Sequence, residues 1–174
     1  TDLSFKSVLR LKIIAKELAL TDTLICICTV AEQLPFHNSV IDIFISNSVL
    51  EHLHDEVGAI AEMNRVCTPK AELMIAIPIA YRYLNPLFIP LNYVHDKRIG
   101  HLRRYDEGSM QRKFSNWKMQ RIYYTGHTIK VLKIIINLLF PVFDLQQIEK
   151  DDARLENGKW MASNIICFLS RVPS

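Results

Sequence analysis

The sequence predicts an α/β domain built around a mostly parallel sheet. Helix-like segments alternate with short runs rich in β-branched residues, which is typical of strand–helix–strand units. The chain has 174 residues, of which 49% are hydrophobic and 22% charged, so it is long enough for one domain with a real core. The sequence holds no internal repeat and no low-complexity linker. We therefore treat residues 1–174 as a single domain.

Three elements open the chain. Residues 4–20 place apolar side chains on one stripe at helical spacing, which predicts an amphipathic helix. Residues 23–30 (TLICICTV) form an apolar run that predicts a buried strand, and residues 41–47 (IDIFISN) predict a second strand. The turn between these strands contains Pro35.

A helix and a third strand follow. The pattern predicts a helix over about residues 55–66, with its first-turn carboxylates favoured by the helix dipole. Pro69 is expected to close the helix before a strand over residues 72–77 (ELMIAI). The expected inward residues are Leu53, Val57, Ile60 and Met63, and the expected outward ones are Asp55, Glu62 and Arg65.

The second half is less regular. Residues 78–100 hold three of the seven prolines without a clear period, so we expect a long loop, and residues 78–105 as a whole a lid on the substrate side. Asp106 is placed to cap a short helix that buries Met110 and Phe114. Residues 117–124 alternate like a strand.

An insertion over residues 125–160 precedes the last expected strand, residues 164–169. Its apolar part, residues 129–143, is too short and too interrupted by Lys130, Lys133 and Pro141 to span a bilayer. A core helix is the favoured interpretation, and a peripheral contact with a membrane surface is the alternative.

Charge and cysteine content exclude several classes of function. The 21 basic and 18 acidic residues leave a net charge of only +3, so we expect no nucleic-acid partner. The Cys26-x-Cys28 pair has no second ligand pair at zinc spacing, so no metal site is expected, and the four cysteines suggest free thiols in a reducing cytoplasm. The sequence leaves the oligomeric state open.

The residues that follow the strands are the candidates for ligand binding, because ligands of parallel α/β sheets lie beyond the carboxyl ends of the strands. These are residues 2–4, 30–36 and 47–53. Asp2, just before the first helix, suits a carboxylate that accepts bonds from two ribose hydroxyls. A simple helix-capping role for Asp2 is the alternative.

The motifs TDLS, AEQLPF, SNSVLEHL and EMNRV, taken in this order, resemble the class I S-adenosylmethionine-dependent methyltransferases, and within them the type-11 family. The likeness covers residues 1–124 and the last strand. It implies a Rossmann-like three-layer sandwich and S-adenosyl-L-methionine as cofactor. It also implies that a first strand and a glycine-rich loop lie upstream of Thr1, where we expect the natural chain to continue.

The resemblance implies roles for individual residues. Asp2, with Leu3 beside it, would hold the cofactor ribose; Val30, Ala31, Glu32 and Leu34 would lie beside the adenine; Asn47 and Ser48 would present backbone groups to the methionine portion. His52 stands at the mouth of the expected site and is the candidate base, with helix packing as its alternative. The candidate acceptor-side residues are His95, His101, Arg104 and Tyr105.

Two departures from the family pattern bear on function. Val30 occupies the position of the adenine-contacting Asp, and Pro69-Lys70-Ala71 replaces a Pro-Gly-Gly turn. The first hypothesis is therefore methyl transfer to a small molecule (a lipid-, quinone- or sugar-derived acceptor), by a fragment that we expect to be inactive alone. A non-catalytic binding module is the second, and a nicotinamide-dependent dehydrogenase, which leaves the LPF and LEHL segments unexplained, is the third.

Overall fold

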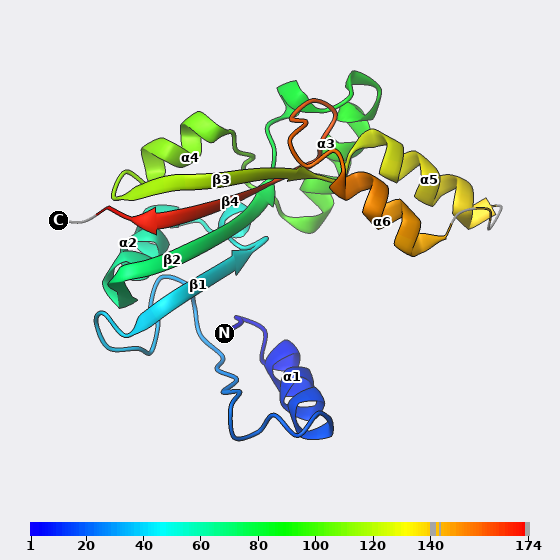
Figure 1. The fold of residues 1–174 in the computed structure, drawn as a ribbon. Helices are drawn as coiled ribbons and strands as arrows, with labels where there is room; N and C mark the ends of the chain where they lie inside the picture. The colour runs from blue at the N-terminus through cyan, green and yellow to red at the C-terminus, as the bar shows by residue number, and fades with distance from the viewer. Residues whose placement is uncertain (140–141, 143, 173–174) are drawn as a thin grey trace.

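The computed structural model describes residues 1–139, 142 and 144–172. Four strands form one sheet in the order β1-β2-β4-β3 (Figure 1). They are β1 (Ile41–Asn47), β2 (Cys67–Pro78), β3 (Trp117–Thr125) and β4 (Asn164–Arg171). β1 and β2 pair in parallel, whereas β4 runs antiparallel to both of its neighbours. The α/β class is confirmed: β1, β2 and β3 share one direction, and the reversed β4 makes the sheet mixed.

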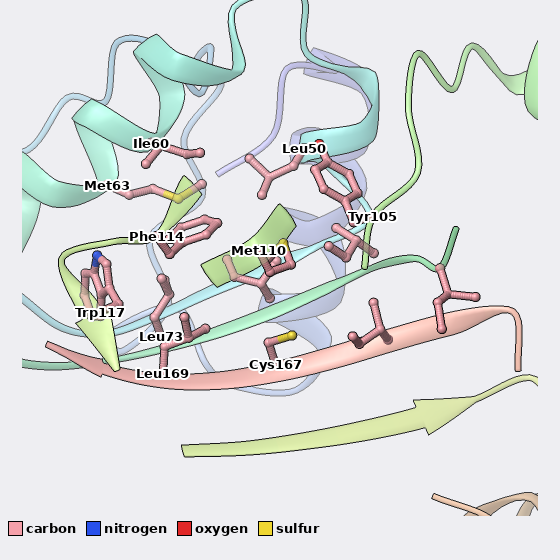
Figure 2. Close-up of a cluster of buried hydrophobic side chains, with 14 of the residues drawn as sticks. Leu50, Ile60, Met63, Leu73, Tyr105, Met110, Phe114, Trp117, Cys167 and Leu169 are labelled. Atoms are coloured by element: carbon pink, nitrogen blue, oxygen red, sulfur yellow. The ribbon is translucent and has the colours of Figure 1, made fainter. Parts of the chain in front are cut away.

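One face of the sheet carries the core. α2 (Glu56–Val66) and α4 (Glu107–Lys113) lie over this face, and their side chains Ile60, Met63 and Met110 point toward Leu73 and Cys167 of the strands (Figure 2). Both helices begin as predicted, with Asp55 accepting from the Gly58 amide and Asp106 forming a capping box with Ser109. Met110 and Phe114 are fully buried, as predicted.

The opposite face and one edge of the sheet are open. β1 is an edge strand, and its Ile43 and Ile45 side chains are 68% and 63% exposed. They line a groove of about 620 Å³ together with Met74 and Phe168. The described part of the chain therefore leaves an apolar sheet face in contact with solvent.

The other helices lie beyond the β1 edge or beyond one end of the sheet (Figure 1). α1 (Phe5–Glu17) lies on the β1 side, capped by Ser4, and α5 (Thr128–Leu139) pairs with α6 (Leu145–Ala153) through Lys130–Glu149 and Lys133–Asp151 ion pairs of 2.7 and 2.6 Å. Three single helical turns are also described: η1 (Leu50–His52), η2 (Tyr81–Tyr83) and η3 (Pro86–Phe88). One further helix, α3 (Ile89–Ile99), follows η3 directly.

The strand predicted over residues 23–30 is wrong. A strand needs a ladder partner. Among the described residues the strand-like pairing of this segment is one isolated bridge to Asp2, with bonds of 3.1 Å from the Asp2 amide to the Ile27 carbonyl and from the Thr29 amide to the Asp2 carbonyl. The segment is extended, yet it does not join the sheet.

The long loop predicted over residues 78–100 is also wrong, because it contains η2, η3 and α3. Pro90 is tolerated in the first turn of α3, where no helical hydrogen bond is lost, and Gly100 ends the helix in the left-handed conformation (φ 82°). Two of the three prolines that suggested a loop, Pro86 and Pro90, thus lie at the start of a helical element, and the third, Pro78, ends β2.

Three smaller predictions need correction. Val57 is 77% exposed rather than inward, and Pro69 lies inside β2, where the pairing of β1 with β2 is irregular and tolerates its missing N–H. Part of the predicted apolar segment 129–143 (residues 140, 141 and 143) lies outside the described residues. Among the residues described, no helix is long and apolar enough to cross a membrane.

Candidate functional site

A pocket of about 480 Å³ opens beyond the carboxyl end of β1. Its walls come from three segments that are distant in the sequence: the amino-terminal residues, the turn after residue 29, and β1 with the turn that follows; Met63 of α2 also lines it. Of the nine predicted cofactor and catalytic residues, eight line it: Asp2, Leu3, Val30, Ala31, Glu32, Leu34, Ser48 and His52. Asn47 is exposed and does not line it.

Asp2 is held at the pocket by its own backbone. Its amide and carbonyl both bond to the extended segment that ends at Thr29, and its Oδ1 accepts from the Ser4 amide at 2.7 Å. Ser4, and not Asp2, caps α1. The exposed carboxylate of Asp2 therefore remains able to accept further bonds at the pocket rim.

The turn over residues 34–38 is fixed by two side chains of α2. Glu62 accepts from the Leu34 amide at 2.9 Å, while Arg65 donates to the carbonyls of Leu34 and Phe36 at 3.0 and 2.8 Å. Glu62 and Arg65 also bond to each other at 2.7 Å. The Arg65 and Leu34 bonds lower the pKa of Glu62 to about 2. We refer to Glu62 and Arg65 as the turn clamp.

The prediction that Glu62 and Arg65 simply face solvent is therefore wrong. Their i,i+3 spacing is a signal for an ion pair on the helix, but the sequence contains no sign that the pair also binds a turn 28 residues away.

A strained residue follows β1. Ser48 has a φ of 54°, in the left-handed region that non-glycine residues rarely adopt, and its amide donates to the Ala76 carbonyl at 2.8 Å. This bond anchors the turn to β2, so the chain bends sharply at the pocket wall. Strain of this kind is often found at functional sites, where the surrounding structure holds it in place.

Behind the pocket wall lies a cluster of Glu51, His52 and His101. Glu51 is completely buried, and neither carboxylate oxygen makes a hydrogen bond. Burial raises the pKa of Glu51, and the Glu51 backbone amide together with the nearby His101, His52 and Arg104 offsets this only in part. The His101 Nε2 atom lies 3.7 Å from Glu51 Oε1, and the rings of His52 and His101 meet edge to face at 4.7 Å.

Arg104 and Asp96 form a buried ion pair next to this cluster. Arg104 donates to Asp96 from Nε at 2.6 Å and from Nη2 at 2.8 Å, and Tyr81 and His101 also bond to the same carboxylate. Burial works to raise the pKa of Asp96, but these bonds outweigh it and lower the pKa. The Arg104 side chain is only 7% exposed, and its two bonds hold the Asp96 carboxylate in place.

The predicted acceptor-side residues do not meet at one place. None of the four lines the 480 Å³ pocket: His95 lines a separate pocket of about 350 Å³, and His101 and Arg104 line one of about 120 Å³. Tyr105 is buried in the core, where its hydroxyl donates to Glu56 at 2.7 Å. Burial, and then the Glu56 bond, raises the pKa of Tyr105. Contact of these four residues with an acceptor stays a prediction.

Residues 1–75 match the family described as "Methyltransferase domain". No curated protein has a matching sequence. Similar solved structures include the MccD protein (TM-score 0.68, 13% identity, 98% of this chain and 78% of that one) and the cyclase SpnF (0.67, 13%, 99% and 65%). Another is geranyl diphosphate C-methyltransferase from Streptomyces coelicolor A3(2) (0.66, 14%, 98% and 63%), solved with Mg²⁺, geranyl diphosphate and S-adenosyl-L-homocysteine.

These likenesses agree with the α/β class of the fold. At 13–14% identity the structures show a shared fold, and this chain spans 63–78% of their length. Residues 1–75 thus resemble a methyltransferase domain, and nearly the whole chain has the Rossmann-like α/β fold of the similar structures, in agreement with the resemblance to the type-11 methyltransferases.

Proposed function

We propose that this chain provides the cofactor pocket of an enzyme that transfers a methyl group from S-adenosyl-L-methionine to a small-molecule acceptor. The observation that carries the proposal is that Asp2, Glu32, Leu34 and Ser48, from three separate segments, line one pocket. Its volume of about 480 Å³ lies within the ~300–1,000 Å³ typical of small-molecule sites.

The donor set fits an adenosyl group with a sugar and a polar tail. The carboxylate of Asp2 suits ribose hydroxyls, as charge-assisted bonds to vicinal hydroxyls are directional and strong. Apolar Leu34 and Ala31 offer surface for a purine ring, and the turn clamp holds that wall rigid. The bend at Ser48 brings backbone groups to the pocket.

The bound cofactor supplies a methyl group on a sulfonium, which is already activated for displacement. The protein then has to hold the acceptor atom in line with that carbon and exclude water. His52, at the pocket mouth, is our candidate for taking a proton from an acceptor hydroxyl or acidic carbon. The apolar groove beside His95 supports a hydrophobic acceptor such as a lipid- or quinone-derived molecule, with a sugar-derived acceptor as the alternative.

A non-catalytic binding module is the second candidate, and Val30 favours it. Its side chain faces the pocket and cannot accept a hydrogen bond from an adenine amine. The cyclase SpnF, which shares the fold, is named for a reaction other than methyl transfer, so the fold alone does not decide the activity.

Calorimetry with S-adenosyl-L-methionine on the folded protein tests the proposal. We expect binding in the wild type and at least ~10-fold weaker binding in Asp2→Ala, because one charged hydrogen bond contributes roughly 1.5–3 kcal/mol. Asp22→Ala, a change of an exposed aspartate in the turn after α1, is the matched control and should bind like the wild type. Equal loss in both variants, or no heat at millimolar cofactor, would refute the role of Asp2 or of the pocket.

A further inference from the structure

The Glu51 carboxylate is an anomaly for a core position. It is 0% exposed and both of its oxygens lack a hydrogen-bond partner. An ionised carboxylate without a partner costs several kcal/mol to bury, so native proteins pair such a group, bind a cation to it or leave it protonated.

His101 Nε2 lies 3.7 Å from Glu51 Oε1, which is too long for a hydrogen bond, and a ring nitrogen of His52 lies within 4.8 Å of the Glu51 carboxylate. Among the described residues, the Glu51 carboxylate therefore lacks a side-chain hydrogen-bond partner.

The two histidines are oriented with their Nε2 atoms available. The Nδ1 atom of His52 bonds to the Gly100 carbonyl at 3.3 Å, and the Nδ1 atom of His101 bonds to Asp96 Oδ1 at 3.0 Å. A carbonyl and a carboxylate only accept, so in each ring Nδ1 carries the hydrogen. In the neutral ring Nε2 then keeps its lone pair. Metal-bound histidines show the same support, with the second ring nitrogen bonded to a carboxylate or a carbonyl.

The backbone fixes this geometry. The Leu102 amide donates to the Glu51 carbonyl at 2.8 Å, and the His101 amide donates to the Asp96 carbonyl at 2.8 Å. Gly100, in the left-handed conformation, makes the turn that brings the end of α3 against η1. One potential ligand atom from each of Glu51, His52 and His101 lies within 4.8 Å of the other two.

We propose that Glu51, His52 and His101 form a binding site for a divalent transition-metal ion such as Zn²⁺. Two imidazoles and one carboxylate are a donor set that such ions prefer, with further positions left for water or substrate. With metal–ligand bonds of roughly 2.0–2.2 Å, two ligands of one ion lie roughly 3–4 Å apart, so only small side-chain rotations are required.

The site would connect the proposed cofactor pocket with the acceptor side. His52 lines the 480 Å³ pocket and His101 the adjacent pocket of about 120 Å³. An oxygen-bearing group of an acceptor is therefore the class of ligand that could complete the coordination. Metal binding does not depend on methyl transfer, but it does exclude the proton-accepting role of His52 while the ion is bound.

Zinc titration of the metal-stripped chain tests the proposal, with Co²⁺ as a spectroscopic probe. We expect one Zn²⁺ per chain by calorimetry, a higher Tm with Zn²⁺, and the visible d–d absorption of Co²⁺ in a nitrogen and oxygen site. Glu51→Gln should weaken Zn²⁺ binding by roughly 100-fold or more, beyond the 10–100-fold typical of losing a supporting group. Without metal its Tm should equal or exceed that of the wild type, because the unpaired buried charge is gone.

His52→Ala provides a second, half-exposed ligand variant, and the surface changes Glu17→Gln and His37→Ala are the matched controls. Absence of Zn²⁺ binding, equal binding by Glu51→Gln and the wild type, or equal weakening by the control variants would each overturn the site. Calorimetry with S-adenosyl-L-methionine is a separate measurement, so Zn²⁺ binding without cofactor binding would count against the proposed function alone, and the reverse result against the metal site alone.

Discussion

At the scale of single residues, the pocket is shaped as much by supporting side chains as by those that face it. The turn clamp does not line the pocket, yet it bonds three backbone groups of the turn that does. Asp96, which is hidden from solvent, bonds to the His101 ring, and the Gly100 carbonyl bonds to the His52 ring. Such residues resemble ordinary helix and core positions in the sequence, because their partners are far away along the chain.

The turn clamp predicts a pH-dependent difference in stability. Glu62 has a folded-state pKa of about 2 against an ordinary value near 4.5, so its ionised form stabilises the fold above pH ~4.5 and this contribution is lost as the pH falls toward 2. Glu62→Gln should therefore have a lower urea midpoint than the wild type at pH 6. The two midpoints should converge as the pH falls below 4.5.

Glu17→Gln, at an exposed site on α1, serves as the control and should track the wild type at every pH. If the difference in urea midpoint between the wild type and Glu62→Gln stays constant from pH 6 to pH 3, the ionised form of Glu62 does not stabilise the fold.

Val30 offers a gain-of-function prediction. The type-11 resemblance places an acidic residue at this position, and Val30 is 41% exposed at the pocket. Val30→Asp should tighten cofactor binding about tenfold, since a charge-assisted hydrogen bond contributes roughly 1.5 kcal/mol or more. Calorimetry would check this, with Val40→Asp, exposed and outside the pocket, as the control. Unchanged affinity in Val30→Asp would favour the binding-module alternative.

At the scale of elements, the joint between α3 and the His101 segment depends on one glycine. Gly100 has a φ of 82° and open space around its α-carbon, so an added methyl group would clash with nothing and act only through backbone strain. Gly100→Ala should cost about 1–2 kcal/mol of unfolding free energy.

Gly108, inside α4 with an ordinary helical backbone, is the matched site for the same change. Gly108→Ala should be neutral or stabilise by up to about 1 kcal/mol, because alanine favours helix. Urea denaturation of both variants gives the comparison, and destabilisation of similar size in the two would contradict the strain argument.

Some helices and strands can be predicted from local sequence patterns alone, and others cannot. Caps and apolar spacing predict α1, α2 and α4 within a few residues, because these signals are local. The segment over residues 23–30 has the composition of a strand, but strand formation depends on a partner, which composition does not reveal. α3 is not predicted because Pro90 and the weak amphipathicity of the segment hide the helical pattern in the sequence.

At the scale of the whole molecule, the open sheet face predicts that copies of this chain associate with one another. Ile43 and Ile45 project from an edge strand whose outer backbone groups have no strand partner within the described residues. Apolar edge strands of this kind pair with other chains unless a charge prevents it. The double variant Ile43→Lys, Ile45→Lys should therefore scatter less light at a given concentration and elute later in size-exclusion chromatography.

Val57→Lys changes a single apolar residue that is 77% exposed on α2 and is the control, expected to leave association unchanged. Equal scattering by the double variant and the wild type would mean that the β1 edge is not the contact surface.

The pocket walls have a final consequence for how a ligand and the fold influence each other. α1 buries only Val8 and Ala15 among its thirteen residues, so the amino-terminal segment contributes little core of its own. A molecule that contacts Asp2 on one side and Ser48 on the other would bridge the amino-terminal segment to the sheet and stabilise their packing. Ligand binding in the pocket and docking of the amino-terminal segment are then thermodynamically linked, so each should favour the other. The measured affinity should be lower than the intrinsic affinity, because ligand binding also restrains α1.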